Sequence, residues 1–173
     1  MSATTAGDAA DRLQQDPLQL DSLQSDPLQL DRQVCFALSV AARNVVAVYR
    51  PLLEPMGLTH PQYLVMLALW ERSPRSVKDL SGALALDPGT LSPLLKRLEA
   101  AGLIERGRAP SDERTLAVTL TDAGRELRAK AEAVPPAIVA RLGIPVSELE
   151  DLHAALTRMI AATRAVPEPA TAP

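Results

Sequence analysis

The stretch Asp87-Pro-Gly-Thr-Leu-Ser-Pro-Leu-Leu-Lys-Arg-Leu-Glu-Ala-Ala101 predicts the most distinctive helix of this 173-residue chain. Asp87 is a good N-cap and a proline suits the first helical position, so the helix begins here. Its leucines recur at spacings of three and four and form one apolar stripe, which consists of Leu91, Leu94, Leu95 and Leu98. The opposite face carries hydrogen-bonding, compact or cationic side chains, namely Thr90, Ser92, Pro93, Lys96 and Arg97. Those groups suit base edges in the major groove of DNA, although an ordinary solvated helix face has the same composition.

Two apolar runs after this helix predict a β-hairpin. Leu103-Ile-Glu-Arg106 and Leu116-Ala-Val-Thr-Leu-Thr121 alternate or run apolar, and the polar turn 107–114 separates them. Gly102 is well placed to close the preceding helix as its C-terminal cap. The order of short helix, turn, second helix and hairpin predicts a winged helix-turn-helix, in which the second helix enters the major groove.

Three arginines, Arg106, Arg108 and Arg114, are expected on or beside the tip of that hairpin. Asp112 stands two residues before Arg114, close enough to brace its guanidinium across the turn. An arginine held out on a ribbon can enter a narrow minor groove, where the negative potential is enhanced. The alternative is an ordinary surface ion pair, which contributes about 1 kcal/mol at most.

The remaining periodic segments predict five further helices, over about 31–53, 60–72, 76–84, 121–142 and 146–164. Capping boxes at Thr59–Gln62 and Ser147–Glu150 and an N-cap at Thr121 mark three of the starts. Pro51 and the pair Pro135-Pro136 are expected to end or kink their helices, because each removes an amide donor. The predicted fold class is therefore mainly α with a small β-hairpin wing.

The two ends of the chain differ from its middle. A ten-residue motif occurs twice in succession, over 11–20 and 21–30, with a proline in each copy. Two such copies cannot stack into a solenoid core, so we expect a flexible N-terminal arm over 1–28. The proline-rich segment 166–173 is expected to be a disordered tail. The winged-helix domain then spans 29–165, with its DNA-binding part over about 60–120.

Composition narrows the function classes. The chain is 47% apolar and has one cysteine, two histidines and a net charge of −3. These values exclude a wholly disordered chain, a disulfide scaffold and a Cys- or His-rich metal site, and we expect neither metal nor cofactor. We see no apolar run of about 20 residues and no secretory signal, which predicts a cytoplasmic protein without a membrane partner. Residues 72–130 hold 11 Lys and Arg against 8 Asp and Glu, so the middle of this acidic chain is mildly basic, which favours contact with DNA.

The run from Gly89 to Arg106, followed by Ser111-Asp-Glu-Arg114 and Leu120-Thr-Asp-Ala-Gly124, resembles the MarR family of dimeric winged-helix regulators. The resemblance covers about residues 30–165. It implies that Asp112 and Arg114 act in the wing, and that the first, fifth and sixth helices form a homodimer interface. Two-fold symmetry then implies a pseudo-palindromic operator on double-stranded DNA, with the two recognition helices about one helical turn apart.

Cys35 lies in the first turns of the first predicted helix. A free cysteine is most often a small buried hydrophobe. Near a helix N-terminus, however, the dipole favours the reactive thiolate, whereas the nearby Asp31 opposes it. Tyr49 lies within roughly 40° of the Cys35 stripe but about 21 Å farther along the helix. Across a dimer with antiparallel first helices, Tyr49 of one subunit would meet Cys35 of the other and donate a hydrogen bond to its thiolate.

The segment from Leu30 to Leu38, together with Tyr49-Arg-Pro-Leu-Leu53, resembles the OhrR branch of the MarR family, whose members sense organic hydroperoxides. That branch has a cysteine at the position of Cys35. Two positions depart from it, because Ser39 and His60 stand where tyrosine is common. Ser39 and His60 are therefore candidate members of a thinner network around the thiolate, which implies an altered sensitivity or choice of oxidant.

The resemblance implies a repressor that releases its operator when an organic hydroperoxide oxidises Cys35. A low-molecular-weight thiol then caps the product, or further oxidant drives it to the sulfinic acid; with no second cysteine, an intramolecular disulfide is ruled out. Within the family, the alternative is a repressor released by a small phenolic or aromatic ligand, with Cys35 inert. The alternatives from other classes are a thiol peroxidase and a helical adaptor without a DNA role. We expect a regulator rather than an enzyme, because Cys35 has no resolving cysteine or catalytic pair.

Overall fold

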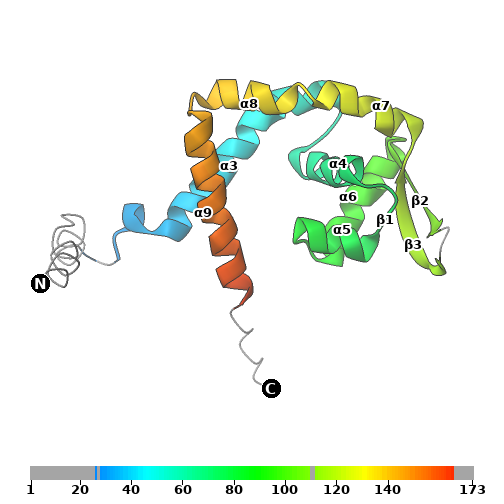
Figure 1. Ribbon diagram of the computed structural model, residues 1–173, viewed down its shortest axis with the longest axis horizontal. Helices are drawn as coiled ribbons and strands as arrows, with labels where there is room; N and C mark the ends of the chain where they lie inside the picture. The colour runs from blue at the N-terminus through cyan, green and yellow to red at the C-terminus, as the bar shows by residue number, and fades with distance from the viewer. Residues whose placement is uncertain (1–25, 27, 110–111, 166–173) are drawn as a thin grey trace, which may run out of the picture. The chain divides into compact units, whose positions relative to one another are not determined.

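The computed structural model describes residues 26, 28–109 and 112–165, and for 108–109 and 112–116 the backbone alone (Figure 1). Most of the predicted N-terminal arm and its repeat, and the predicted tail 166–173, lie outside the described residues. Contacts group the chain into two units, Met1–Val45 and Val46–Pro173. The expected domain limits of 29 and 165 remain predictions.

The first unit contains the 3-10 helix η1 (Leu30–Arg32) and the first part of helix α3 (Val34–Leu53). Among its described residues none is buried, and the side chains of Leu30 and Val34 are 62% and 60% exposed. Single apolar side chains on a protein surface are ordinary. Several exposed apolar side chains at the start of one helix, with no buried residue beside them, indicate a surface that contacts another molecule or segment. The described residues of the first unit therefore leave the apolar side chains at the start of α3 unburied.

The second unit contains the winged helix-turn-helix. Its helices are α4 (His60–Glu71), α5 (Val77–Leu84) and α6 (Pro88–Ala100), and its strands are β1 (Arg75–Ser76), β2 (Ile104–Ala109) and β3 (Asp112–Leu120). The strands form an antiparallel sheet in the order β1-β3-β2. Figure 1 shows the hairpin of β2 and β3 at the edge of this unit, beside α6. The predicted order of elements and the predicted fold class are confirmed.

The core of this unit is built on the leucine stripe of α6. Leu91, Leu94, Leu95 and Leu98 are all buried, as their spacing predicted. Around them pack buried side chains from α4, α5 and the sheet, among them Met66, Leu69, Leu80, Ile104 and Val118. Because burying one such side chain contributes about 1.5–3 kcal/mol, this cluster fixes α6 and leaves its opposite face free.

Most of the predicted helix starts are confirmed by hydrogen bonds. Asp87 Oδ1 accepts from the Thr90 amide at 2.9 Å, and Thr121 Oγ1 accepts from the Gly124 amide at 3.0 Å. Gln62 Oε1 accepts from the Thr59 amide at 2.8 Å, which closes the first capping box. Gly102 follows α6 at φ 70°, a left-handed conformation that suits glycine.

The second capping box is wrong. Helix α9 (Val146–Arg164) has Pro145 as its N-cap, so Ser147 lies inside the first turn and makes no capping bond. The helix starts earlier because the Pro145 carbonyl already accepts from the Leu149 amide at 3.2 Å. A proline at the N-cap position can therefore begin this helix without a side-chain cap.

The predicted single helix 121–142 is two helices, α7 (Asp122–Ala131) and α8 (Val134–Leu142). Pro135 and Pro136 lie in the first turn of α8, where a missing amide costs no helical hydrogen bond. The predicted interruption at this proline pair is confirmed, but two residues earlier in the chain. Pro51 stays inside α3, which ends at Leu53 before the 3-10 helix η2 (Glu54–Met56).

The hairpin differs from its prediction in length. The polar segment 107–114 was expected to be a turn, yet β2 continues to Ala109 and β3 begins at Asp112. Arg106 faces Val118 across the ladder, so it lies toward the base of the wing and not near its tip. The polarity of the segment was misleading, because backbone hydrogen bonds between two strands can extend into a polar segment.

One described helix passes the length and composition test for a membrane span. It covers Val34–Met56, with a mean hydropathy of 1.2 and 6% of the window buried. By that test the expectation that no segment is long and apolar enough is wrong, because Arg43 and Arg50 interrupt the apolar run without lowering its mean enough. The core helix of a soluble protein and a signal sequence near an N-terminus pass the same test, so one such helix is weak evidence for a membrane span.

Candidate nucleic-acid interface and redox site

The exposed face of α6 holds the five residues predicted to read DNA. Thr90, Pro93, Lys96 and Arg97 are exposed and Ser92 is partly exposed. The Thr90 hydroxyl donates to Asp87 Oδ2 at 2.6 Å, and this bond holds the pKa of the Asp87 carboxyl below its usual value. Thr90 therefore helps to cap the helix, and its oxygen remains an acceptor.

A carboxylate at the end of α6 ties this helix to the wing. Arg106 in β2 donates from Nε to Glu99 Oε2 at 2.9 Å, and a second bond runs from its Nη2 to the same oxygen. These hydrogen bonds lower the pKa of Glu99 and raise that of Arg106. Arg106 is thus engaged within the protein, which corrects the expectation that it accompanies the arginines at the hairpin tip.

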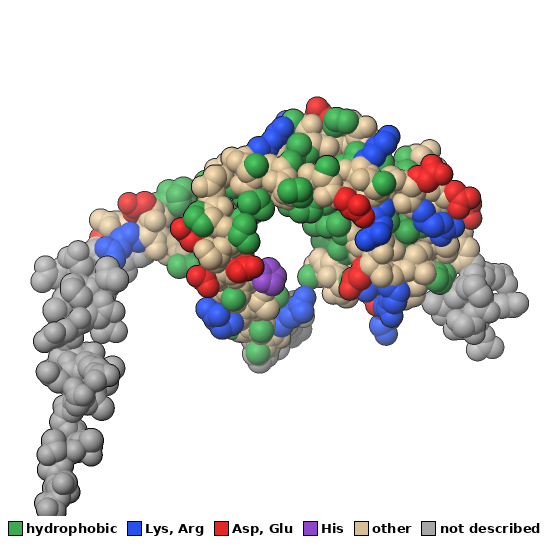
Figure 2. Space-filling model, turned by 45° about the horizontal axis from the view of Figure 1, so that its top comes forward, with side chains coloured by type: hydrophobic (Ala, Val, Ile, Leu, Met, Phe, Trp, Pro, Cys, Tyr) green, Lys and Arg blue, Asp and Glu red, His purple; other side chains and the backbone are tan. Residues whose placement is uncertain are grey.

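The predicted wing residues Arg108, Asp112 and Arg114 have side chains outside the described part of the structure. Their backbone places Arg108 opposite Leu116, and Asp112 opposite Ala109, with an irregularity in the ladder between Arg108 and Ala109. On the face that Figure 2 shows, Lys and Arg side chains alternate with Asp and Glu. The roles of the wing residues in DNA contact stay predictions.

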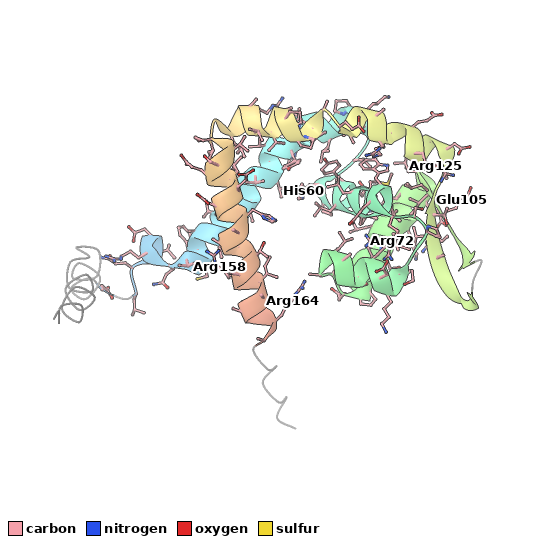
Figure 3. All side chains as sticks on the ribbon, in the orientation of Figure 1. His60, Arg72, Glu105, Arg125, Arg158 and Arg164 are labelled. Atoms are coloured by element: carbon pink, nitrogen blue, oxygen red, sulfur yellow. The ribbon has the colours of Figure 1, made fainter. Side chains whose placement is uncertain are left out.

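Sequence reasoning missed an ion-pair cluster where α4 meets α5. Arg72 Nη2 and Arg75 Nε both donate to Asp79 Oδ2, at 2.6 and 2.9 Å, and Arg75 Nη1 donates to the Ala68 carbonyl at 2.9 Å (Figure 3 labels Arg72). This cluster joins the end of α4 to the start of α5 and so fixes the first helix of the reading pair. The spacing of four between Arg75 and Asp79 was the available signal.

Cys35 is exposed in the first turn of α3. The Ser39 hydroxyl donates to the Cys35 carbonyl at 2.8 Å, so Ser39 contacts the backbone of the cysteine residue. The predicted sensor residue is therefore open to oxidants within its own unit. The hydroxyl of Ser39 therefore bonds to the backbone carbonyl of Cys35 and not to its thiol.

Tyr49 and His60 meet in the second unit. Their ring centroids are 4.9 Å apart at an interplanar angle of 67°, and Tyr63 lies 6.0 Å from Tyr49 on another side. Burial raises the pKa of Tyr49 and lowers the pKa of His60, so both rings are held neutral at pH 7. His60 thus makes an edge-to-face ring contact with Tyr49, and its expected role in the network around the Cys35 thiolate stays a prediction.

A cavity of about 290 Å³ opens beside this ring pair. It is lined by His60, Thr59, Pro61, Leu58, Val46, Arg50 and Glu54. Its walls combine apolar surface with a neutral imidazole and one charge of each sign, a setting in which a small partly polar group fits. Among the described residues, no group of three or more His, Cys, Asp or Glu could hold a metal ion.

Comparisons with known proteins agree with this geometry. The model of the SarA/Rot transcriptional regulators matches residues 47–131. The HTH-type transcriptional regulator TtmR of Methylorubrum extorquens (strain PA1) is 47% identical over 116 residues, which cover 67% of this chain and 60% of TtmR. The match thus spans about three-fifths of that relative. The organic hydroperoxide resistance transcriptional regulator of Bacillus subtilis (strain 168) is 43% identical over 120 residues, covering 69% of this chain and 80% of the relative.

Solved structures show the same fold. Reduced AbfR bound to DNA has a TM-score of 0.64 and 33% identity, covering 84% of this chain and 98% of that one. CouR from Rhodococcus jostii RHA1, bound to p-coumaroyl-CoA, has a TM-score of 0.67 and 28% identity, covering 76% and 94%.

The fold and the exposed helix face define a winged helix-turn-helix DNA-binding protein. The relatives named above are transcriptional regulators, and a solved structure of similar fold is a regulator of the MarR family. The chain belongs to the MarR family of winged-helix transcriptional regulators.

Proposed function

We propose that this regulator is a homodimeric repressor that senses organic hydroperoxides through Cys35. The observation that carries the proposal is the exposed Cys35 thiol in the first turn of α3, in a chain 43% identical to an organic hydroperoxide resistance regulator. A thiolate reacts with a peroxide only where the oxidant can reach it. The position of Cys35 meets that requirement.

Exposed apolar side chains support the dimer. Besides the start of α3, large apolar side chains of α9 are exposed, with Leu152 at 51%, Ile160 at 51% and Met159 at 38%. Apolar surface of this kind on helices is the usual mark of a subunit interface. A second copy of this chain is the occupant we propose, and a two-fold dimer reads a pseudo-palindromic operator.

In that dimer, the phenol of Tyr49 of the partner subunit approaches Cys35 and stabilises its thiolate. The Tyr49 ring is held in place by contacts with His60 and Tyr63. A neutral phenol is the form that donates a hydrogen bond to sulfur, and burial keeps Tyr49 neutral. His60 and Ser39 supply the remaining polar atoms of this network.

The chemistry balances without a cofactor. The Cys35 thiolate attacks one oxygen of the hydroperoxide, the O–O bond breaks, and an alcohol leaves after taking up a proton. Sulfur loses two electrons and becomes a sulfenic acid. A low-molecular-weight thiol then displaces water to form a mixed disulfide, or a second hydroperoxide oxidises the sulfenic acid to the sulfinic acid and leaves as alcohol. The added bulk disturbs the subunit contact and moves the two reading units.

DNA contact falls to α6 and the wing. Thr90, Ser92, Pro93, Lys96 and Arg97 face the major groove in this proposal. Arg108 and Arg114 reach the minor groove or phosphates, with Asp112 bracing Arg114. A regulator of chromosomal DNA with a reduced thiol belongs in the cytoplasm.

A gel shift on the DNA upstream of the protein's own gene tests the sensor. Reduced wild-type protein binds this fragment, cumene hydroperoxide releases it, and dithiothreitol restores binding after a mixed disulfide forms. Cys35→Ser binds equally well and ignores the peroxide. Release of the Cys35→Ser variant by peroxide would refute the proposal.

A second candidate is a repressor released by a small aromatic ligand, with Cys35 inert. A cavity of about 250 Å³ favours it, because the rings of Tyr63 and Trp70 line it and suit an aromatic ligand. Its charged lining residues are Arg128, Glu71 and Glu132, and Arg128 pairs with Glu132. The related CouR was solved with an aromatic thioester bound. Alkylation of Cys35 separates the two candidates: it leaves ligand release intact and abolishes peroxide release.

We further infer that the chain is no enzyme. A thiol peroxidase would reduce many equivalents of hydroperoxide per Cys35 with a recycling thiol. A sensor consumes only one or two equivalents of hydroperoxide per Cys35. An assay of hydroperoxide consumption therefore distinguishes the sensor from the peroxidase.

A further inference from the structure

Three aromatic rings follow one another in the second unit. Tyr49 lies 6.0 Å from Tyr63, and Tyr63 lies 6.3 Å from Trp70, with interplanar angles of 43° and 67° between the successive pairs. Tyr63 and Trp70 are two turns apart on α4, so one helix carries both rings past the same side. Such ring pairs contribute about 0.5–1.5 kcal/mol beyond their buried area. A displacement of the Tyr49 ring would therefore change its packing against Tyr63, and in turn the packing of Tyr63 against Trp70.

The row ends on a backbone group of α7. Trp70 Nε1 donates to the Gly124 carbonyl at 2.8 Å. Gly124 in turn lies so close to the chain that a Cβ built there would stand 2.0 Å from the Leu103 carbonyl oxygen. Leu103 directly precedes β2, so Trp70 holds a residue of α7 whose backbone lies against the base of the wing.

Further hydrogen bonds fasten that contact. Thr121 Oγ1 accepts from the Gly124 amide and donates to the Gly102 carbonyl at 2.7 Å. The Thr121 amide donates to the Leu103 carbonyl at 3.2 Å. Gly102 and Leu103 connect the recognition helix α6 to β2. The start of α7, the end of α6 and the start of the wing thus form one hydrogen-bonded junction, to which Trp70 is attached.

The rings also have room to move. The cavity of about 250 Å³ is bordered by Tyr63 and Trp70. A side chain that borders open volume can reorient without displacing close-packed neighbours. Trp70 is only partly buried, whereas Tyr63 is 2% exposed. The end of the row nearer the wing is therefore the less buried one.

We propose that Trp70 is the positioning residue that couples Tyr49 to the junction of α6, the wing and α7. Through its indole N–H it sets the position of Gly124, and through its ring contact with Tyr63 it responds to Tyr49. The signal that moves Tyr49 rests on the proposed function, since it is oxidation of Cys35 of the partner subunit. The coupling itself is reciprocal, so DNA bound at α6 and the wing acts on Trp70 as well.

Trp70 is the only tryptophan of the chain, so its fluorescence reports this position alone. Addition of operator DNA to the reduced wild-type protein changes the intensity or the maximum of the Trp70 emission, and the change saturates with the gel shift. A scrambled duplex of equal length gives a smaller change. Constant emission through complete operator binding would overturn the coupling, and this measurement needs neither a variant nor a peroxide.

The second experiment measures the ratio of operator affinities before and after peroxide treatment. Trp70→Phe keeps an aromatic ring and removes the bond to Gly124, so its Cys35 oxidises at the wild-type rate while the ratio falls at least threefold. Tyr63→Phe, which keeps the ring row, retains the wild-type ratio. A wild-type ratio in Trp70→Phe would overturn the coupling.

The two proposals fail differently. Wild-type protein that stays on its operator with Cys35 fully oxidised, as mass spectrometry would show, refutes the peroxide sensor. The change in Trp70 emission on operator binding is measured without peroxide, so it still tests the coupling when the peroxide sensor is refuted. Trp70→Phe is compared with wild type in thermal unfolding, and if it does not fold, the wild-type emission titration decides alone.

Discussion

Glu99 at the end of α6 receives both hydrogen bonds that the Arg106 guanidinium directs out of β2. The two residues lie on opposite sides of the left-handed Gly102, where the chain turns from helix to strand. An arginine fork on one carboxylate oxygen restrains direction as well as distance. The recognition helix and the base of the wing are therefore held as one reading element.

Breaking this pair is expected to weaken DNA binding more than stability. Arg106→Ala lets the wing move relative to α6, and operator affinity falls by up to about fivefold. Fluorescence anisotropy with a labelled operator measures the change. Arg125→Ala is the matched control, because Arg125 makes an exposed pair with Asp122 on α7.

A charge swap tests the geometry itself. Glu99→Arg combined with Arg106→Glu recovers part of the affinity that either change alone removes. If Arg106→Ala binds as wild type does, the pair has no part in holding the wing.

Local signals explain what the sequence predicted well. The leucine stripe of α6 and the caps at Asp87 and Thr121 depend on residues within one or two turns, so their spacing suffices. These local features account for the recognition helix, whereas the functional roles of Cys35, Tyr49 and the wing residues remain predictions.

Features that depend on distant partners escaped prediction. The pairing of Arg106 with Glu99 depends on how far the hairpin extends, which a polar segment does not reveal. Strand β1 has only two residues and exists because Arg75 and Ser76 find partners in β3. The row of rings from Tyr49 to Trp70 joins separate helices, so no sequence period reports it.

Gly124→Ala is expected to destabilise the folded protein. The added Cβ would meet the Leu103 carbonyl oxygen at 2.0 Å, and both partners are backbone that cannot turn aside. Overpacking of this kind costs about 1–3 kcal/mol, which urea unfolding resolves. Gly82→Ala on α5 is the matched control, because a Cβ there meets nothing within 4 Å. Removal of a helical glycine stabilises by roughly 0.5–1 kcal/mol, so opposite signs are expected.

The half-buried His60 is expected to make stability depend on pH. Burial lowers its pKa below 6.5, so between the folded and unfolded values the unfolded chain binds more protons. The contribution of the neutral ring is complete above pH 6.5 and is lost as the pH falls through the folded pKa. Unfolding free energies measured from pH 7.5 downward decline less for His60→Gln than for wild type. His153→Gln, which alters an exposed histidine of α9, leaves the wild-type decline unchanged; an equal slope in all three proteins would contradict the prediction.

Arg114→Ala is expected to weaken operator binding and flatten its salt dependence. An arginine on a phosphate or in the minor groove releases counterions, and losing it lowers the slope of log K against log salt by about 1. Anisotropy titrations at several salt concentrations give the slope. Arg158→Ala on α9 is the control for a lost surface cation (Figure 3). Unchanged affinity and slope in Arg114→Ala would remove this residue from the DNA interface.

Tyr49→Phe separates the two parts that Tyr49 plays in these proposals. The variant keeps the ring contacts with His60 and Tyr63, so reduced protein binds its operator as wild type does. It lacks the hydroxyl that donates to the thiolate of Cys35 in the partner subunit. A hydrogen bond to a charged group contributes about 1.5–3 kcal/mol, which corresponds to oxidation slower on the order of ten- to a hundredfold. Mass spectrometry of Cys35 over time after a pulse of cumene hydroperoxide measures the rate, with Tyr63→Phe as the matched loss of one hydroxyl. Equal oxidation rates in Tyr49→Phe and wild type would show that the Tyr49 hydroxyl does not donate to the Cys35 thiolate. The proposed contact between Tyr49 of one subunit and Cys35 of the other would then be refuted.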